Sequence, residues 1–123
     1  MGIKVRIGLM ALGLVATAAA AQSPRRLVVV VGQPGDPRVT QQHAALEHAA
    51  AALRERDLVV QGITPEAARR QRPELGVSSQ AAFEVLLVGK DGKVKLRREK
   101  LVAASEITAL IDTMPMRQNE MRR

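Results

Sequence analysis

The densest group of side chains that could act chemically is a run of basic residues in the last third of the chain. Six cations lie between positions 90 and 100: Lys90, Lys93, Lys95, Arg97, Arg98 and Lys100. Several cations on one surface attract anions over a distance, so this run could form an anion-binding surface. Lysines on the outermost strand of a sheet also prevent that strand from pairing with other chains. The sequence leaves both interpretations open.

Metal ligands are the next possibility. His43 and Glu47 lie four residues apart, on one face of a predicted helix, and His48 is close by. A protein metal site needs three or four ligands and a supporting shell, so we expect core-edge and solvent-exposed histidines instead. Three methionines offer soft ligands of the kind that copper(I) prefers: Met114, Met116 and Met121. The first of them belongs to the apolar face of a helix, and no metal or other cofactor is predicted.

Nucleophilic and redox chemistry have few candidate residues. The chain contains no cysteine, which removes thiol exchange and thiolate metal sites. Its only histidines, His43 and His48, share one helix, and no serine or aspartate beside them forms a nucleophile motif. No catalytic residue is therefore predicted. A non-enzymatic binding domain is expected, with a cysteine-independent enzyme as the alternative.

The first 21 residues are typical of a secretory signal peptide. Lys4 and Arg6 precede an uncharged, mostly apolar run, and Ala19-Ala20-Ala21 matches the small residues that signal peptidase accepts. The apolar run is shorter than the roughly 20 residues that span a bilayer, which disfavours a membrane anchor. We therefore expect an exported protein, periplasmic or secreted, whose mature chain begins at Gln22.

The charge balance favours anionic partners. The chain has 19 basic and 12 acidic side chains, a formal net charge of +7. An anionic envelope surface or an acidic protein would suit such a domain. Nucleic acid is a less suitable partner, because Phe83 is the only aromatic residue and single strands are usually held by stacking on aromatics.

The elements that must position these residues alternate along the chain. Four strands are predicted, at residues 27–31, 57–63, 83–88 and 93–97. The fourth follows the hairpin signal Asp91-Gly92 and alternates strictly, so we expect Val94 and Leu96 to face the core. The basic residues of this strand are expected to face water together: Lys93, Lys95 and Arg97.

Three helices are predicted between and after the strands. The first begins at Asp36, a preferred N-cap, and Pro37, and ends in Arg54-Glu55-Arg56. Its N-terminus could bind an anion, but Asp36 competes for the same N–H donors. A second, short helix is predicted at 65–72. The last helix has an apolar face and ends at Pro115, and we place the domain at 22–114 and a charged, loosely ordered tail at 115–123. That face consists of Ile107, Leu110, Ile111 and Met114.

The predicted order is βαβαββα. The first and third strands are the most apolar and belong in the centre of the sheet, while the basic fourth strand suits an edge. A right-handed crossover makes the first two strands parallel. The fold class is therefore α/β and thioredoxin-like, with a four-stranded mixed sheet in the order 4-3-1-2 and helices on both faces.

Several stretches resemble a bacterial family of exported proteins named domain of unknown function 4174. The matching residues are 36–38 (Asp-Pro-Arg), 53–60, 86–97 and 110–117. The resemblance implies a thioredoxin-like fold, distantly related to peroxiredoxins, and an exported location. It implies no established activity and no functional residues.

Two features of true thioredoxins are missing from this sequence. The redox motif would lie between the first strand and the first helix, where this chain has Gly32-Gln33-Pro34-Gly35-Asp36. The cis-proline that contacts the substrate would precede the third strand, where this chain has Ser79-Gln80-Ala81-Ala82. Thiol–disulfide exchange needs a thiolate, so this chemistry is excluded. The sequence predicts an exported binding or envelope-interaction domain.

Overall fold

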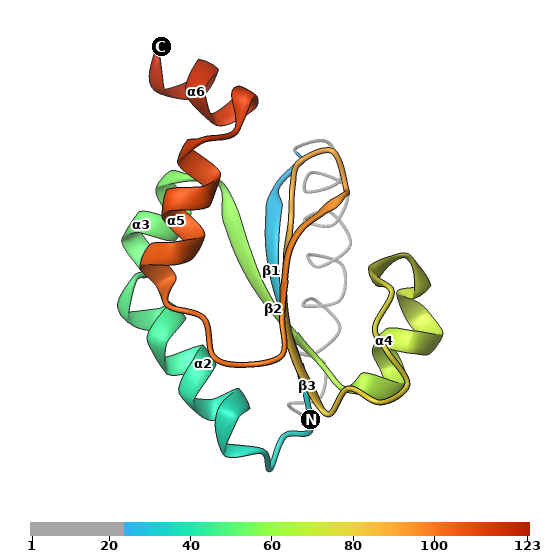
Figure 1. The fold of residues 1–123 in the computed structure, drawn as a ribbon. Coiled ribbons are helices and arrows are strands. Elements are labelled where there is room, and N and C mark those ends of the chain that lie inside the picture. The colour runs from blue at the N-terminus through green and yellow to red at the C-terminus, as the bar shows by residue number, and fades with distance from the viewer. Residues whose placement is uncertain (1–23) are drawn as a thin grey trace, which may run out of the picture.

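The predicted strands form one four-stranded sheet in the order β2-β1-β3-β4, which confirms the predicted order 4-3-1-2 (Figure 1). The computed structural model describes residues 24–123, so the predicted signal peptide at 1–21 lies outside the described residues. The strands are β1 (Arg26–Gly32), β2 (Leu58–Ile63), β3 (Phe83–Val88) and β4 (Val94–Arg98). The helices are α2 (Pro37–His48), α3 (Ala50–Glu55), α4 (Pro65–Gln71), the short 3-10 helix η1 (Pro73–Leu75), α5 (Ala104–Asp112) and α6 (Pro115–Met121).

The two inner strands carry two separate cores. β1 runs parallel to β2 and antiparallel to β3, and its valines alternate between the two faces of the sheet. Val28 and Val30 pack under α2, α3 and α5, whereas Val29 and Val31 pack under α4 and the loop that follows it. Figure 1 shows this division, with α2, α3 and α5 on one side of the sheet and α4 on the other.

The predicted first helix is divided at Ala49 into α2 and α3. Asp36 caps α2 as predicted, because its carboxylate accepts a hydrogen bond from the N–H of Arg38 at 2.9 Å. Gln42, fully buried on α2, donates to the carbonyl of Val102 at 2.9 Å and accepts from its N–H at 2.8 Å. These two bonds tie α2 to the segment that precedes α5.

The predicted alternation of β4 is wrong, because a β-bulge interrupts it. Leu96 lies opposite Leu87, but Val94 lies opposite Val88, and Lys95 is the extra residue between them. Val94 and Leu96 therefore pack on opposite faces of the sheet. The basic residues of this strand do not share one outward face.

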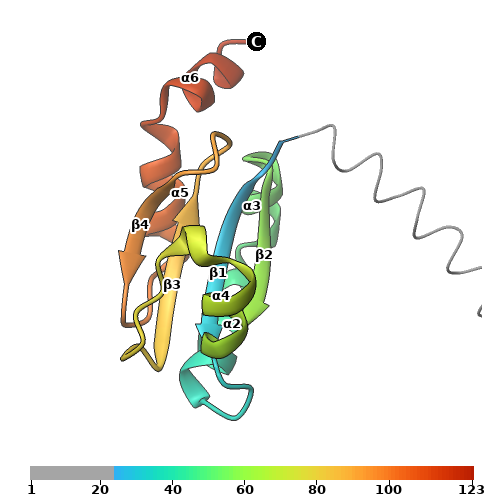
Figure 2. The ribbon, with the colours of Figure 1, turned by 90° about the vertical axis from the view of Figure 1, so that its right-hand side faces the viewer.

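The predicted loose tail at 115–123 is also wrong over most of its length. Residues Pro115–Met121 form α6, which begins with proline at its first turn and continues beyond α5 at one end of the sheet (Figure 2). Arg117 on α6 is only 5% exposed, so the helix is packed onto the domain. We call this end of the molecule, where β1 and β2 begin and β3 ends, the α6 pole.

Candidate functional site

The structure does not gather the six predicted cations into one free surface. Four of them form ion pairs with carboxylates at 2.8–3.1 Å: Lys90 with Asp57 and Glu120, Lys95 with Asp91, Arg97 with Glu84, and Arg98 with Glu106. Lys93 and Lys100 have no such partner among residues 24–123, and they lie beyond opposite ends of β4. Much of the predicted charge is therefore neutralised locally.

Arg97 has a structural role that the sequence did not indicate. It lies opposite Leu86, on the α4 side of the sheet, where its guanidinium donates to the carboxylate of Glu84 at 3.0 Å. Glu84 is 1% exposed, so the cation compensates a buried anion. A second guanidinium nitrogen of Arg97 donates to the carbonyl of Leu75, which fastens η1 to the edge of the sheet.

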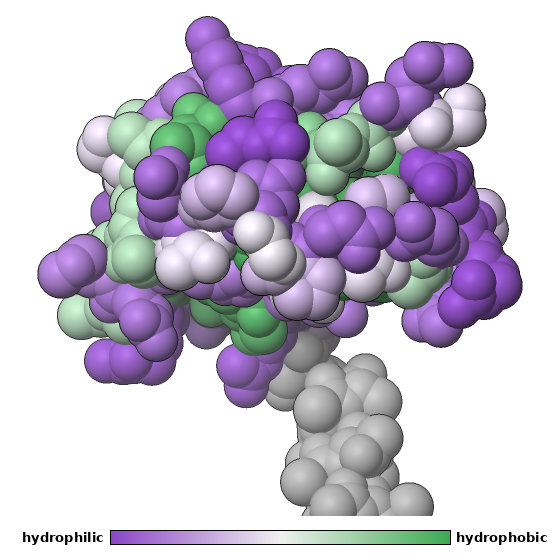
Figure 3. Space-filling model, turned by 90° about the horizontal axis from the view of Figure 1, so that it is seen from below, coloured by the Kyte–Doolittle hydropathy of each residue, from purple (hydrophilic) through white to green (hydrophobic). Residues whose placement is uncertain are grey.

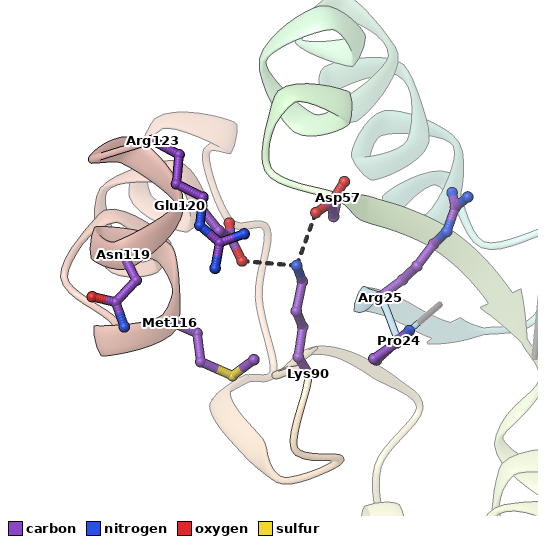
Figure 4. A pocket seen from close by; sticks show the side chains of 8 residues that line it. All are labelled: Pro24, Arg25, Asp57, Lys90, Met116, Asn119, Glu120 and Arg123. Carbon is purple, nitrogen blue, oxygen red and sulfur yellow. Dashed lines mark hydrogen bonds and ion pairs between the residues drawn. The ribbon is translucent and has the colours of Figure 1, made fainter. Parts of the chain in front are cut away.

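Unpaired cations do meet at the α6 pole, around a cavity of about 620 Å³ that we call the α6 pocket. Arg25, just before β1, and Arg123, just after α6, line it, and the Arg25 side chain points away from its centre (Figure 4). Neither forms an ion pair with a carboxylate in the described chain. Lys93 is exposed in the hairpin that also carries Lys90 to the pocket. Exposed cations from three distant segments therefore lie at this pole.

Lys90 lies at the centre of the pocket and holds its walls together. Its ammonium donates to Asp57 and to Glu120, each at 2.8 Å (Figure 4). Burial lowers the pKa of Lys90, but the hydrogen bonds to Asp57 and Glu120 and the negative charges of these two carboxylates together leave the pKa above its ordinary value. Asp57 has a φ of 54°, a left-handed conformation that aspartate tolerates better than most residues. The hairpin, the α3–β2 turn and α6 are thus joined by one cation.

Behind the pocket, buried arginines fix α6 to the domain. Arg26 is 1% exposed, and its two terminal nitrogens each donate a hydrogen bond to one carboxylate oxygen of Glu120 at 3.3 Å. Arg117 reaches Asp112 at 3.2 Å and Glu55 at 3.4 Å. This network was not predicted from the sequence, although the proline at the start of α6 and the i,i+3 spacing of Arg117 and Glu120 are signals of a helix.

The opposite pole contains the loop between β1 and α2. There the carboxylate of Asp36 also accepts from the guanidinium of Arg38, at 2.6 and 3.0 Å, and that guanidinium lies 4.9 Å from the ring centre of Phe83. Figure 3 shows this end from below, where hydrophilic residues predominate and hydrophobic ones are scattered. The N-terminus of α2 is thus occupied by its own cap.

The two histidines lie as expected, His43 half-buried at the edge of the core and His48 exposed. His43 lies over Gly62 of β2, since a methyl group added to that glycine would stand 3.2 Å from its Nε2. Within residues 24–123, no three His, Asp or Glu side chains are grouped to hold a metal ion. Of the methionines, Met114 packs against the core, whereas Met116 and Met121 are each 50% exposed.

The sheet order, the crossover and the two helical layers define a thioredoxin-like fold, and solved structures show the same class. Chloroplastic thioredoxin z superposes with a TM-score of 0.56 at 21% identity, covering 83% of this chain and 91% of its own. The reduced 2-Cys peroxiredoxin of Plasmodium vivax gives 0.58 at 12% identity, covering 80% of each chain. Trxlp from Edwardsiella tarda EIB202 gives 0.54 at 20% identity, covering 79% of this chain and 91% of its own.

The chain belongs to the family described as Domain of unknown function (DUF4174), whose model matches residues 18–120. No curated protein matches it significantly. The match extends through α6, which agrees with a domain that includes this helix. None of the helices within residues 24–123 has the length and apolar character needed to cross a membrane. This family member has a thioredoxin-like fold and no cysteine, so thiol redox chemistry is absent from the chain.

Proposed function

We propose that this protein is an exported, non-enzymatic binding domain that attaches to anionic lipid surfaces through its α6 pole. The observation that carries the proposal is that three exposed cations lie at one end of the domain: Arg25 and Arg123 line the α6 pocket, and Lys93 lies in the β3–β4 hairpin at the same end. Exposed cations on one pole attract a phosphate-rich surface over roughly a Debye length, about 8 Å at physiological salt. Each such residue near an anionic leaflet contributes about 1 kcal/mol, so three support weak, reversible attachment.

The absence of a catalytic constellation supports a non-enzymatic role. The pole at which thioredoxins carry their thiols has a capped helix and no thiol here. In the α6 pocket, Lys90 is held by two carboxylates, and its pKa is raised rather than lowered. A lysine that acts as a base or nucleophile needs the opposite shift. The groups present are suited to charge recognition.

The N-terminal sequence supports the exported location. Its basic start, apolar run and three alanines are those of a cleaved secretory signal. Expression of the full-length gene, cell fractionation and intact-mass measurement should give a periplasmic or secreted species that begins at Gln22. A membrane-bound species that retains residues 1–21 would contradict this part of the proposal.

Vesicle sedimentation tests the binding. The protein should bind phosphatidylcholine vesicles that contain phosphatidylglycerol, should not bind pure phosphatidylcholine, and should be released by high salt. Replacing Arg25, Lys93 and Arg123 with glutamine should abolish the binding. The matched control changes three cations elsewhere in the same way: Arg69, Arg70 and Lys100.

Two outcomes would refute the lipid proposal. If the pole variant and the control variant lose binding equally, net charge alone is responsible and the pole is not a site. If the wild-type protein ignores anionic vesicles but binds an acidic protein, the surface recognises a protein instead.

A further inference from the structure

The two edges of the sheet differ in how they are protected. β4 carries Lys95, Arg97 and Arg98 and is interrupted by a bulge, and both features hinder pairing with another strand. β2, at the other edge, has the sequence Leu-Val-Val-Gln-Gly-Ile and contains no charge and no proline. Within the described chain it pairs only with β1. β2 therefore presents an open row of backbone donors and acceptors, and its own side chains carry no charge. The cation in contact with it is Arg72, which donates to the side chain of Gln61 at 3.1 Å.

An apolar groove runs along this open edge. A hollow of about 630 Å³ lies between β2 and the helices α2 and α3, and Leu58 and Val60 of β2 line it. A smaller hollow of about 230 Å³ extends the groove past Gly62 and Ile63, and Val39 lines both. The groove thus follows the whole length of the strand.

The helical wall of the groove presents a regular stripe. It consists of Thr40, Ala44, Glu47, Ala51 and Arg54, which recur at spacings of four and three and are all exposed. Four of them line the larger hollow, Ala51 being the exception. Ala44 and Ala51 are small enough to admit another helix closely. The stripe carries opposite charges at its middle, Glu47, and at its C-terminal end, Arg54.

We propose that the occupant of this edge is a second copy of the chain, which adds its own β2 in antiparallel orientation about a two-fold axis. Self-pairing of an uncharged strand brings no like charges opposite one another, which charged edge strands would do. The same axis sets the two helical stripes side by side and antiparallel. Glu47 of one copy then faces Arg54 of the second copy, so the charges are complementary.

The strand and the stripe agree in register. A two-fold axis normal to the sheet pairs residues that point to the same face, and an axis at Val60 sets Leu58 opposite Gly62 of the second copy. Arg54 lines the groove with Leu58, and His43 lies over Gly62. With helical and extended rises of about 1.5 and 3.3 Å per residue, the axis crosses the helices near Ala50 when counted from Arg54 and near Glu47 when counted from His43. The mean of the two lies between His48 and Ala49, so the axis passes between Glu47 and Arg54, and the long arginine side chain spans the remaining offset.

Light scattering coupled to gel filtration tests the proposal on the protein purified after full-length expression. The wild type should be a dimer that dissociates on dilution. Ala44→Lys places a charge at the helix contact and should weaken the dimer at least about tenfold in Kd. Ala45→Lys is the matched control, because the neighbouring alanine is exposed but lies outside the groove. It should leave the dimer unchanged.

Charge reversal gives a second, independent measurement. Glu47→Lys and Arg54→Glu should each weaken the dimer, and the double variant should recover it, because the two charges then exchange places across the axis. A monomer at every concentration, or equal effects of Ala44→Lys and Ala45→Lys, would overturn the proposal. These substitutions leave the α6 pole intact, so the vesicle assay reports on the lipid surface separately.

Discussion

Glu120 is the carboxylate on which the docking of α6 depends most, and Glu120→Gln tests this dependence. Its two oxygens accept both terminal nitrogens of Arg26 at 3.3 Å and the ammonium of Lys90 at 2.8 Å. Because Arg26 is 1% exposed, water cannot replace the lost counter-charge there. Lys90 keeps Asp57 as its second partner, so the substitution acts chiefly through the buried arginine.

The expected cost lies between those of exposed and buried ion pairs. Removing one partner from a buried pair costs about 3–5 kcal/mol, whereas an exposed pair contributes about 0–1 kcal/mol. The Glu120 side chain is 22% exposed, and Arg26 keeps a bond to the carbonyl of Arg56 at 2.8 Å. We therefore expect about 2 kcal/mol. At 1.4 kcal/mol per factor of ten, the opening equilibrium of α6 rises roughly thirtyfold.

Hydrogen exchange followed by mass spectrometry measures this opening directly, in the peptide that covers α6. The matched control is Glu106→Gln, which removes the carboxylate of an exposed pair with Arg98 at 3.1 Å. The control should change exchange in its own helix by less than about threefold. Equal effects of the two substitutions on α6, or no effect of either, would refute the view that buried arginines hold this helix.

The remaining predictions concern the core and pH. Gln42→Ala should cost about 3 kcal/mol in urea denaturation, since it leaves the buried N–H and carbonyl of Val102 unpaired. Ile111→Ala, at a fully buried position, should cost about 2–5 kcal/mol, and Leu110→Ala should cost less because that side chain is only partly buried. Hydrogen bonds from Arg56 and Arg117 hold the pKa of Asp112 below its ordinary value. The ionised carboxylate should therefore stabilise the fold fully above about pH 4, and this stabilisation should be lost as the pH falls through the lowered pKa. Hydrogen exchange in α6 should become faster over the same pH range.

The order of the elements could be predicted because it rests on local patterns. The apolar runs of β1 and β3 and the regularly spaced apolar residues of α5 each lie within one short segment of the sequence. The bounds of β3 were predicted residue for residue. The bulge in β4 could not be predicted in this way. It arises from pairing with β3, and strict alternation in a single strand gives no sign of which residue will be skipped.

The candidate site could be predicted only in part, because it is made of long-range ion pairs. Lys90 was included among the basic residues, but its partners Asp57 and Glu120 lie 33 and 30 residues away. Arg26 lies between a short polar segment and the run of valines, and a charged residue in that position is usually exposed to solvent. In the structure it is buried. A charge pattern predicts attraction in general. It does not show which carboxylate each cation will meet.

The bond between Arg26 and Glu120 joins the first strand to the last helix, 94 residues apart. Both synthesis and the export proposed above deliver the chain from its N-terminus, so Arg26 emerges before the carboxylate that neutralises it. Burying an arginine without a counter-charge is costly, and the start of β1 should therefore remain solvated until the C-terminal residues emerge. Burial of Arg26 therefore depends on the last helix. In a chain that stops before Glu120, the start of β1 should stay hydrated and open, and proteases should cleave it more easily.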